Sequence, residues 1–307
     1  MTRGEVPNLR KTAGRAIFSL FLLLFAAACG TKTASVRAEA AYYLADQDPR
    51  KIVKIVECAN SPAAQLLLMQ FSHRFMQLAP VPPAWQTLPS VTEQDWEELR
   101  KPSVIGLYDF AFIGDEFLVK DLQRQGILRS AAPVFREEII LAGPQEALYS
   151  MWEMSLEEVM RTIAKDDLFF FSLVKNPWAL GAEHELWRRS GTKAHEHSPK
   201  YVESGRDDVS ALMQAGDEGA FILVGEGSYA QYVVAQRDLP ALRKIAGTKI
   251  YRTTYACTME SAGFRDERLE IADGFLAWLA GEEGRALIES FELGGLSPFI
   301  PPPEERQ

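Results

Sequence analysis

The chain has 307 residues, of which 47% are hydrophobic and 24% carry a charge, and its formal net charge is −9 at pH 7. This length exceeds the usual single-domain size of about 100 to 200 residues, and the hydrophobic content is enough for packed cores, so we expect two lobes. The acidic balance argues against a nucleic-acid-binding protein, because phosphate backbones attract basic surfaces.

The N-terminus has the pattern of a bacterial lipoprotein signal. Four basic residues precede an apolar run at residues 16–25, and three alanines then lead directly to Cys29. The run is too short for a membrane-spanning helix, which needs about 20 apolar residues. We therefore expect residues 1–28 to be cleaved, Cys29 to carry a lipid and residues 29–48 to form a tether. Ala26 stands where such signals usually have a bulky aliphatic residue, so an ordinary secretory signal is the alternative.

Export also sets the charge and the location of the mature protein. Removal of residues 1–28 takes away four basic side chains and one acidic side chain, so the formal charge falls from −9 to −12. Such a protein gains no general attraction to anionic lipid, and we expect the lipid anchor alone to hold it outside the cytoplasm at a membrane. For Cys58 and Cys257, a disulfide and two separate buried thiols are both open.

After residue 50, apolar patterns alternate between strands and helices. The patterns predict strands at 52–56, 104–113, 138–142, 169–172, 220–224 and 249–254, and helices at 63–76, 116–125, 155–164, 179–190, 269–280 and 284–292. The Pro-rich residues 80–83 predict a break. Ser155 and Glu158 have the spacing of a capping box at a helix start. The order of elements predicts an α/β protein with more than one lobe.

Several segments, in order along the chain, resemble the tungstate-binding family of solute-binding lipoproteins, which serve ABC importers. The segments are residues 108–112 (YDFAF), 134–144 (VFREEIILAGP), 183–187 (EHELW), 227–229 (GSY), 272–279 (ADGFLAWL), 284–288 (GRALI) and 295–299 (GLSPF). Each segment is weak alone, and the resemblance depends on their order and spacing over nearly the whole mature chain.

The resemblance implies a two-lobed type II periplasmic-binding-protein fold, with two crossing strands and a ligand cleft between the lobes. The crossings would fall near residues 138–143 and 249–254. Lobe 1 would comprise residues 49–138 plus 252–303, and lobe 2 residues 139–251. Helix N-termini and strand ends that meet in such a cleft form a natural anion site.

The resemblance also places a ligand site. Of the polar run that follows the family's first strand, Asn60 and Ser61 keep suitable donors. The remaining candidates lie at strand ends and turns of the second lobe: Ser172, Lys175, Asn176, Trp178, Arg206, Ser228 and Tyr229. Four of them also have a structural interpretation, with Trp178 packed between lobes, Lys175 in a solvated loop, and Ser228 and Tyr229 holding a turn together.

The expected pocket departs from the family pattern in its charges. Leu173 stands where the family has an arginine, Pro177 and Ala179 replace two hydroxyl residues, and Glu226 replaces a second arginine. A buried divalent oxyanion needs charge-assisted donors, so these changes disfavour tungstate unless Lys175 and Arg206 have taken over. Trp178 favours a partly apolar or organic ligand.

Other chemistry finds little support in the sequence. Three histidines, His184, His195 and His197, lie close together, but their spacing matches no recognised zinc motif, and we expect no metal and no cofactor. The chain has no nucleophile elbow, no His-Glu-x-x-His, no phosphate-binding loop and no dinucleotide fingerprint. We therefore expect no enzyme, and we regard the pairs Glu137-Glu138 and Asp207-Asp208 as ordinary acidic surface.

Two functions from different classes follow. The first is a lipid-anchored solute-binding protein that closes on a small ligand, an oxyanion by family or another small solute by its pocket, and presents it to an ABC permease. The second keeps the fold without the transport, as a sensory or protein-interaction lipoprotein.

Overall fold

The computed structural model describes residues 53–58, 62–78, 83–87, 108–192, 198–236, 240–260 and 267–303. The predicted signal, the tether, Cys29, Asn60, Ser61, His195 and His197 lie outside the described residues. Among the helices that are described, none is long and apolar enough to cross a membrane.

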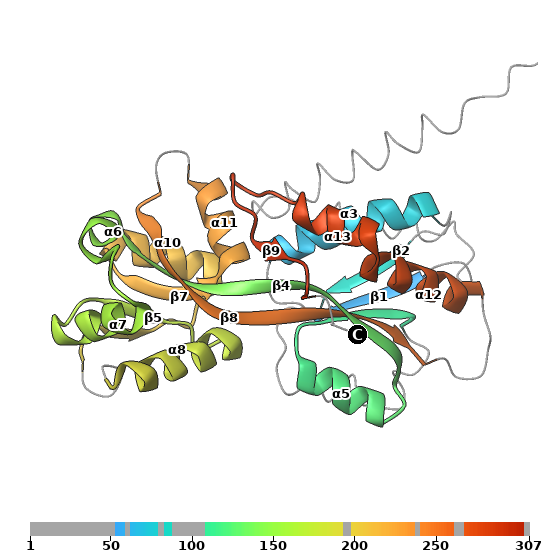
Figure 1. Ribbon diagram of the computed structural model, residues 1–307, viewed down its shortest axis with the longest axis horizontal. Helices are drawn as coiled ribbons and strands as arrows, with labels where there is room; N and C mark the ends of the chain where they lie inside the picture. Colours follow the sequence, from blue (N-terminus) through green and yellow to red (C-terminus); the bar gives the residue numbers. More distant parts are fainter. Residues whose placement is uncertain are drawn as a thin grey trace, which may run out of the picture. The chain divides into compact units, whose positions relative to one another are not determined.

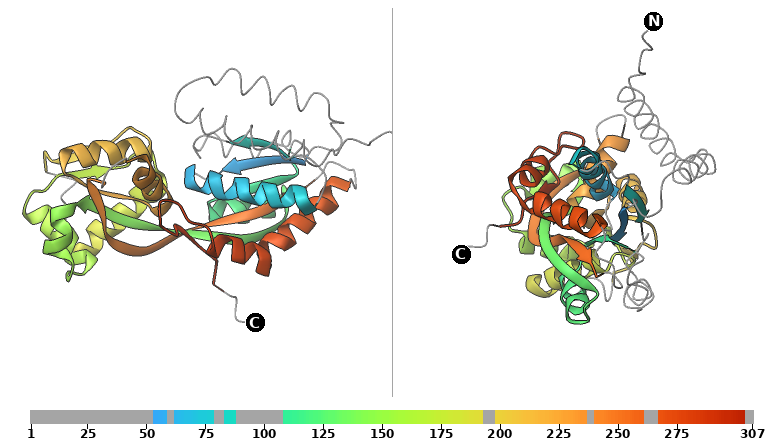
Figure 2. Two further views of the ribbon diagram at one scale, coloured as in Figure 1. Left: turned by 90° about the horizontal axis from the view of Figure 1, so that it is seen from above. Right: turned by 90° about the vertical axis from the view of Figure 1, so that its right-hand side faces the viewer.

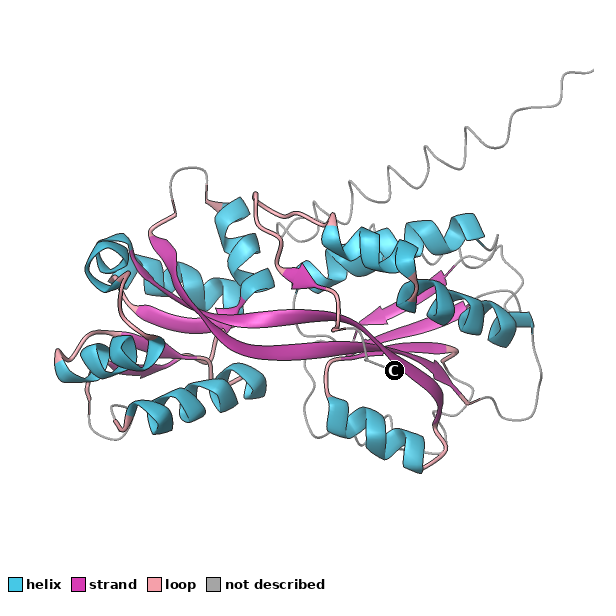
Figure 3. Cartoon of the chain, in the orientation of Figure 1, coloured by secondary structure: helices cyan, strands magenta, loops and turns pink. Residues whose placement is uncertain are grey.

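Helices and strands alternate along most of the chain (Figure 3). The first part contains β1 (Val53–Cys58), α3 (Pro62–Leu78), β2 (Pro83–Thr87), β3 (Phe110–Ile113), α5 (Glu116–Arg124) and β4 (Leu128–Pro144). The middle part contains α6 (Gln145–Met151), α7 (Leu156–Lys165), β5 (Phe170–Ser172), α8 (Pro177–Ser190), β6 (Tyr201–Glu203), α10 (Asp208–Glu218), β7 (Phe221–Gly225) and α11 (Glu226–Ala235). The last part contains β8 (Leu242–Met259), α12 (Glu267–Ala280), α13 (Glu282–Glu289) and β9 (Phe299–Ile300).

The described strands form one mixed sheet in the order β2-β1-β3-β8-β4-β7-β5-β6, and β9 pairs with β4. The outer strands pair in parallel, as the crossover helices between them require, whereas β3-β8, β8-β4 and β4-β7 are antiparallel. The long strands β4 and β8 run side by side through the middle (Figures 1 and 2).

On one side of β4 and β8 the hydrophobic residues form two clusters, one on each face of the sheet. Because side chains alternate along a strand, Ile55 and Phe112 pack with α3, α12 and α13, while Val56 and Ile113 pack with α5. Figure 1 shows α5 on the opposite side of the strands from α3 and α13.

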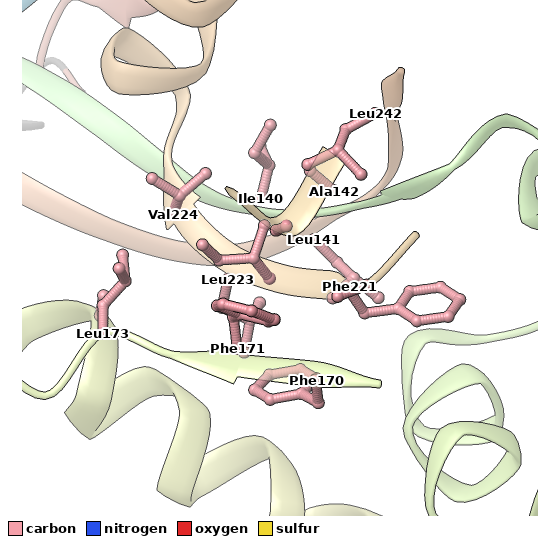
Figure 4. Packing of buried hydrophobic residues seen from close by; sticks show 14 of the residues in the cluster. Ile140, Leu141, Ala142, Phe170, Phe171, Leu173, Phe221, Leu223, Val224 and Leu242 are labelled. Carbon is pink, nitrogen blue, oxygen red and sulfur yellow. The ribbon is translucent and has the colours of Figure 1, made fainter. Parts of the chain in front are cut away.

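On the other side of the crossing, a third cluster joins β4, β5 and β7 to the helices around them. Its members are fully or almost fully buried, and include Phe171, Trp187, Leu223 and Tyr232. Figure 4 shows part of this packing, with the two phenylalanines of β5 below Leu223 of β7. Each of the two lobes therefore has its own core. The predicted α/β architecture with two lobes and two crossing strands is confirmed.

The crossing strands are longer than the sequence predicted. Alternation predicted strands at 138–142 and 249–254, but β4 has 17 residues and β8 has 18. Their pairing is interrupted by register shifts between Pro133 and Phe135 and between Glu138 and Ile140. The first shift adds one residue to β4 and so reverses the face on which its apolar residues lie, which breaks the period-2 signal although the strand continues, while the second adds two residues to β8.

Local sequence signals predicted some of the remaining elements and missed others. The capping box is confirmed, since Ser155 accepts a hydrogen bond from the Glu158 backbone and Glu158 accepts one from the Ser155 backbone. The predicted break at residues 80–83 is wrong in part, because β2 begins at Pro83. Proline is tolerated there because it is the first residue of an edge strand. Helices α6, α10 and α11 were not predicted.

The packing of α12 against α13 gives a matched pair of glycine substitutions. A Cβ at the buried Gly284 would lie 2.3 Å from the backbone oxygen of Leu279, whereas a Cβ at Gly274, exposed in α12, would meet nothing within 4 Å. We expect Gly284→Ala to lower the free energy of unfolding by about 1–3 kcal/mol through overpacking. Gly274→Ala should raise it by up to about 1 kcal/mol through helix propensity. Urea unfolding of both variants checks this, and equal effects would contradict the packing described.

Candidate functional site

Three helices of the second lobe begin close to one another. Helix α8 starts after the N-cap Asn176, α10 starts at Asp208, and α11 starts directly after β7 ends at Gly225. The first turn of a helix has backbone N–H groups without partners and a partial positive charge, so such ends attract acceptors and anions.

One carboxylate joins these three helix ends. Asp208 Oδ2 accepts a hydrogen bond of 3.0 Å from Asn176 Nδ2 and one of 3.1 Å from Ser228 Oγ. Asn176 also caps α8, since its Oδ1 accepts a hydrogen bond from the backbone of Ala179 at 3.2 Å. Burial raises the pKa of Asp208 to about 6, although the hydrogen bond from Ser228, the charge of Arg252 and the hydrogen bond from Asn176 lower it in part.

A second carboxylate, Glu137 on β4, binds the start of α11 and a buried arginine. Its Oε1 accepts a hydrogen bond of 2.9 Å from the backbone N–H of Gly227, and its Oε2 accepts one of 2.7 Å from Arg252 Nη2. Glu137 is 1% exposed and Arg252 8% exposed, and they are cross-strand partners on β4 and β8. Removing one member of such a buried pair usually costs about 3–5 kcal/mol, because the other charge stays buried without compensation.

Trp178 and Gly225 complete the cluster. The guanidinium of Arg252 lies over the indole ring of Trp178, 4.5 Å from its centroid. A Cβ at Gly225 would lie 2.6 Å from Glu137 Oε1 and 3.2 Å from the Trp178 ring. Glycine is therefore required here, because it lets the carboxylate and the indole reach the start of α11.

The structure brings three of the predicted site residues together: Asn176, Trp178 and Ser228. It places Lys175 and Arg206 as exposed side chains. The hydroxyl of Tyr229 donates to the Leu242 carbonyl and accepts from the Lys244 backbone, so it holds β8 against α11. Ser228 and Tyr229 belong to the first turn of α11, where the sequence predicted a turn.

The two positions at which the tungstate-binding family has an arginine have structural roles here. Leu173 is buried in the core of the second lobe beside Leu223 and Val224 (Figure 4). Glu226 forms an ion pair with Lys244 at 2.5 Å. Neither residue therefore supplies a positive charge to the cluster.

Ser172 lies by a different buried carboxylate. Glu183, 1% exposed, accepts hydrogen bonds from Tyr201 Oη at 2.6 Å and Trp187 Nε1 at 3.1 Å. Burial raises the pKa of Glu183, and the hydrogen bonds from Tyr201 and Trp187 offset part of that effect. These contacts join α8 to β6 inside the second lobe and involve none of the residues around Asp208.

Sequence reasoning missed the three charged residues on which the cluster depends. The interpretation of Glu137-Glu138 as acidic surface is wrong for Glu137, which is buried. The interpretation of Asp207-Asp208 as acidic surface also missed a local signal. Asp207 stands three residues before Ser210, which is the spacing of a helix N-cap, and its side chain accepts a hydrogen bond from the Ser210 backbone at 3.0 Å. No local signal identifies Arg252, because its partner is 115 positions away.

The described residues also form a surface depression, which lies apart from this cluster. An open depression of about 610 Å³ lies around α6 and α7, lined by Tyr149, Trp152, Met154 and Arg161 among others, and it includes no residue of the cluster. Within the described part of the chain, no group of three or more His, Cys, Asp or Glu side chains is placed to hold a metal ion.

Comparison with solved structures places this arrangement in a known fold. The tungstate-binding protein TupA from Desulfovibrio alaskensis G20 is 18% identical, with 82% of this chain and 99% of that chain covered and a TM-score of 0.68. The tungstate ABC transporter protein from Geobacter sulfurreducens is 16% identical, covering 80% and 100%, with a TM-score of 0.63. The periplasmic molybdate-binding protein of Azotobacter vinelandii is 14% identical, covering 82% and 100%, with a TM-score of 0.51.

The fold is that of a type II periplasmic binding protein. No protein-family model and no curated protein sequence matches the chain. The resemblance seen in the sequence therefore holds at the level of the fold.

The raised pKa of Asp208 predicts a specific pH dependence of stability. The folded carboxyl keeps its proton to about pH 6, whereas an unfolded one loses it near pH 4, so this group's contribution to stability is present below pH 4 and is lost as the pH rises to 6. We expect Asp208→Asn to stabilise the protein relative to wild type by roughly 1–3 kcal/mol more at pH 7 than at pH 4. Urea unfolding across this range measures the difference.

Glu218→Gln is the matched control, because Glu218 is an exposed carboxylate at the other end of α10. Its stability should follow that of wild type at every pH. Parallel curves for wild type and Asp208→Asn would show that the Asp208 pKa is not raised.

Proposed function

We propose that this protein is the solute-binding component of an ABC importer, held outside the cytoplasm by a lipid on Cys29. The observation that supports it best is the meeting of three helix N-termini beside the two crossing strands. Asn176, Asp208, Ser228 and Trp178 lie at these helix ends, and a small solute bound there would lie next to the strands that join the lobes.

The comparisons support the same function through the fold. The similar structures named above are, by their own descriptions, tungstate- and molybdate-binding proteins, two of them assigned to the periplasm or to an ABC transporter. We place lobe 1 at residues 49–138 plus 252–303 and lobe 2 at residues 139–251, and the candidate residues Asn60 and Ser61 would complete the site from lobe 1. An ABC permease would be the membrane partner, and no catalytic step is part of the proposal.

A second candidate function is favoured by one observation. At the start of each helix, one backbone N–H already donates to an acceptor within the protein: Asn176 for α8, Asp207 for α10 and Glu137 for α11. A protein of this fold that binds no solute would act through a protein partner, as a sensory or interaction lipoprotein.

Solute binding is tested by thermal unfolding of the full chain with a panel of oxyanions, amines, amino acids and sugars. A solute at 100 times its Kd should stabilise the protein by about 2.7 kcal/mol. For a domain of this size, each kcal/mol shifts the Tm by roughly 2–4 °C, so a shift of about 5–11 °C is expected. If no solute shifts the Tm, the importer function fails and the interaction protein takes its place.

The anchor is tested separately in the native host. Wild-type protein should sediment with membranes and incorporate a labelled fatty acid, because the lipid is its expected attachment. Cys29→Ala should abolish the label and leave the protein either soluble outside the cytoplasm or held by an uncleaved leader. An unlabelled wild-type protein would show that the leader is an ordinary secretory signal.

A further inference from the structure

We propose that the site takes a solute with a positively charged N–H group, an ammonium or a guanidinium, and that Asp208 binds that group. The inference rests on the proposed solute-binding function and names its ligand class. It reverses the charge of the ligand that tungstate- and molybdate-binding proteins hold.

At each of the three helix ends, one backbone N–H that could hold an anion already donates to an acceptor of the protein itself. At α8 the Asn176 side chain accepts from Ala179, at α10 Asp207 accepts from Ser210, and at α11 Glu137 accepts from Gly227. An oxyanion uses these same N–H groups, so it would have to displace internal acceptors that are covalently held in place. Two of the three acceptors are carboxylates, which would also repel it.

Arg252, the buried cation of the described cluster, already has an anionic partner, and its buried Nε donates to no described group. Arg252 is only 8% exposed. Its guanidinium donates to Glu137 at 2.7 Å and covers the Trp178 ring. Glu137 accepts one hydrogen bond on each oxygen, so the pair neutralises itself. Glu226 and Lys244 form a second neutral pair. With Asp208 ionised, the side chains of Glu137, Arg252, Glu226, Lys244 and Asp208 have a net charge of −1, and Asp207, which caps α10, adds a second negative charge.

Asp208 also has a carboxylate oxygen that can accept further hydrogen bonds. Both of its hydrogen bonds from described residues, from Asn176 and Ser228, go to Oδ2, and its side chain is partly exposed. A carboxylate has about four acceptor positions, so Oδ1 can accept donors from a ligand. The two bonds to Oδ2 fix the orientation of the carboxylate before the ligand arrives. Charge-assisted N–H bonds to such a group are stronger than neutral ones.

Trp178 gives the second contact of the proposed ligand. Its ring is partly exposed, and Arg252 covers the ring at 4.5 Å from the centroid. The uncovered part of the indole provides apolar surface next to the start of α11, which suits the carbon chain attached to an ammonium or guanidinium. A solute with a charged nitrogen on a short aliphatic chain satisfies both residues.

The experiment measures Kd by calorimetry for the full chain with putrescine, agmatine, lysine and arginine, with tungstate and molybdate, and with choline and glucose. Choline is the matched ligand control, since it has the charge without an N–H donor. We expect at least one N–H cation to bind, choline to bind at least 10-fold more weakly, and neither oxyanion to bind.

Variants then assign the contact. Asp208→Asn should weaken the cation at least 100-fold, and Ser228→Ala, which removes one bond that orients the carboxylate, should weaken it about 5-fold to 10-fold. Glu218→Gln, on the exposed end of α10, should leave Kd within 2-fold. Circular dichroism and a cooperative unfolding transition establish that each variant is folded.

The outcomes separate this inference from the function on which it rests. Binding of tungstate, molybdate or glucose with no cation bound overturns the inference and leaves the solute-binding function standing. A cation that binds Asp208→Asn as tightly as wild type overturns the role of Asp208. The absence of any binding across the whole panel overturns the solute-binding function itself.

Discussion

Arg252 and Glu137 face each other on β8 and β4, in the middle of the only two strands described that run through both cores. Their ion pair is almost fully buried, and it is closed from a third side by the backbone N–H of Gly227 at the start of α11. One carboxylate thus connects both crossing strands to the helix that begins the site. A buried pair of this kind adds little net stability over an apolar pair, but it fixes one arrangement, because a displaced Glu137 or Arg252 would be a buried charge without a partner.

This constraint passes from the strands to the helices through Gly225. With no side chain there, the Glu137 carboxylate and the Trp178 ring both reach the β7–α11 junction. Ser228 follows in the first turn of α11 and donates to Asp208, which in turn accepts from Asn176 at the start of α8. Each contact orients the next residue, so the three helix ends are positioned before any ligand is present. Such preorganisation lowers the cost of binding, because few side chains have to be ordered by the solute.

The sequence predicted the parts of this arrangement that depend on neighbours in the chain. Ser155 with Glu158 is a local signal, and the strand at 220–224 ended close to where β7 ends. The parts that were missed depend on distant partners. Glu137 looks like acidic surface until β4 is known to lie between β8 and β7, and the shift between Pro133 and Phe135 hides the length of the strand. Of the candidate site, Asn176, Trp178 and Ser228 were predicted through a family resemblance, while the charges around them come from tertiary contacts alone.

The same contacts differ from what an anion site requires. An anion site needs helix N–H groups that stay unsatisfied until the ligand binds, and this leaves the empty protein with exposed, uncompensated donors. Here internal carboxylates and one asparagine satisfy those groups, so the empty lobe keeps its helices together. The desolvation of Asp208, which raises its pKa to about 6, is the cost of that arrangement. A positive charge beside Asp208 would lower this cost and a negative charge would increase it, which is the physical basis of the proposed cationic ligand.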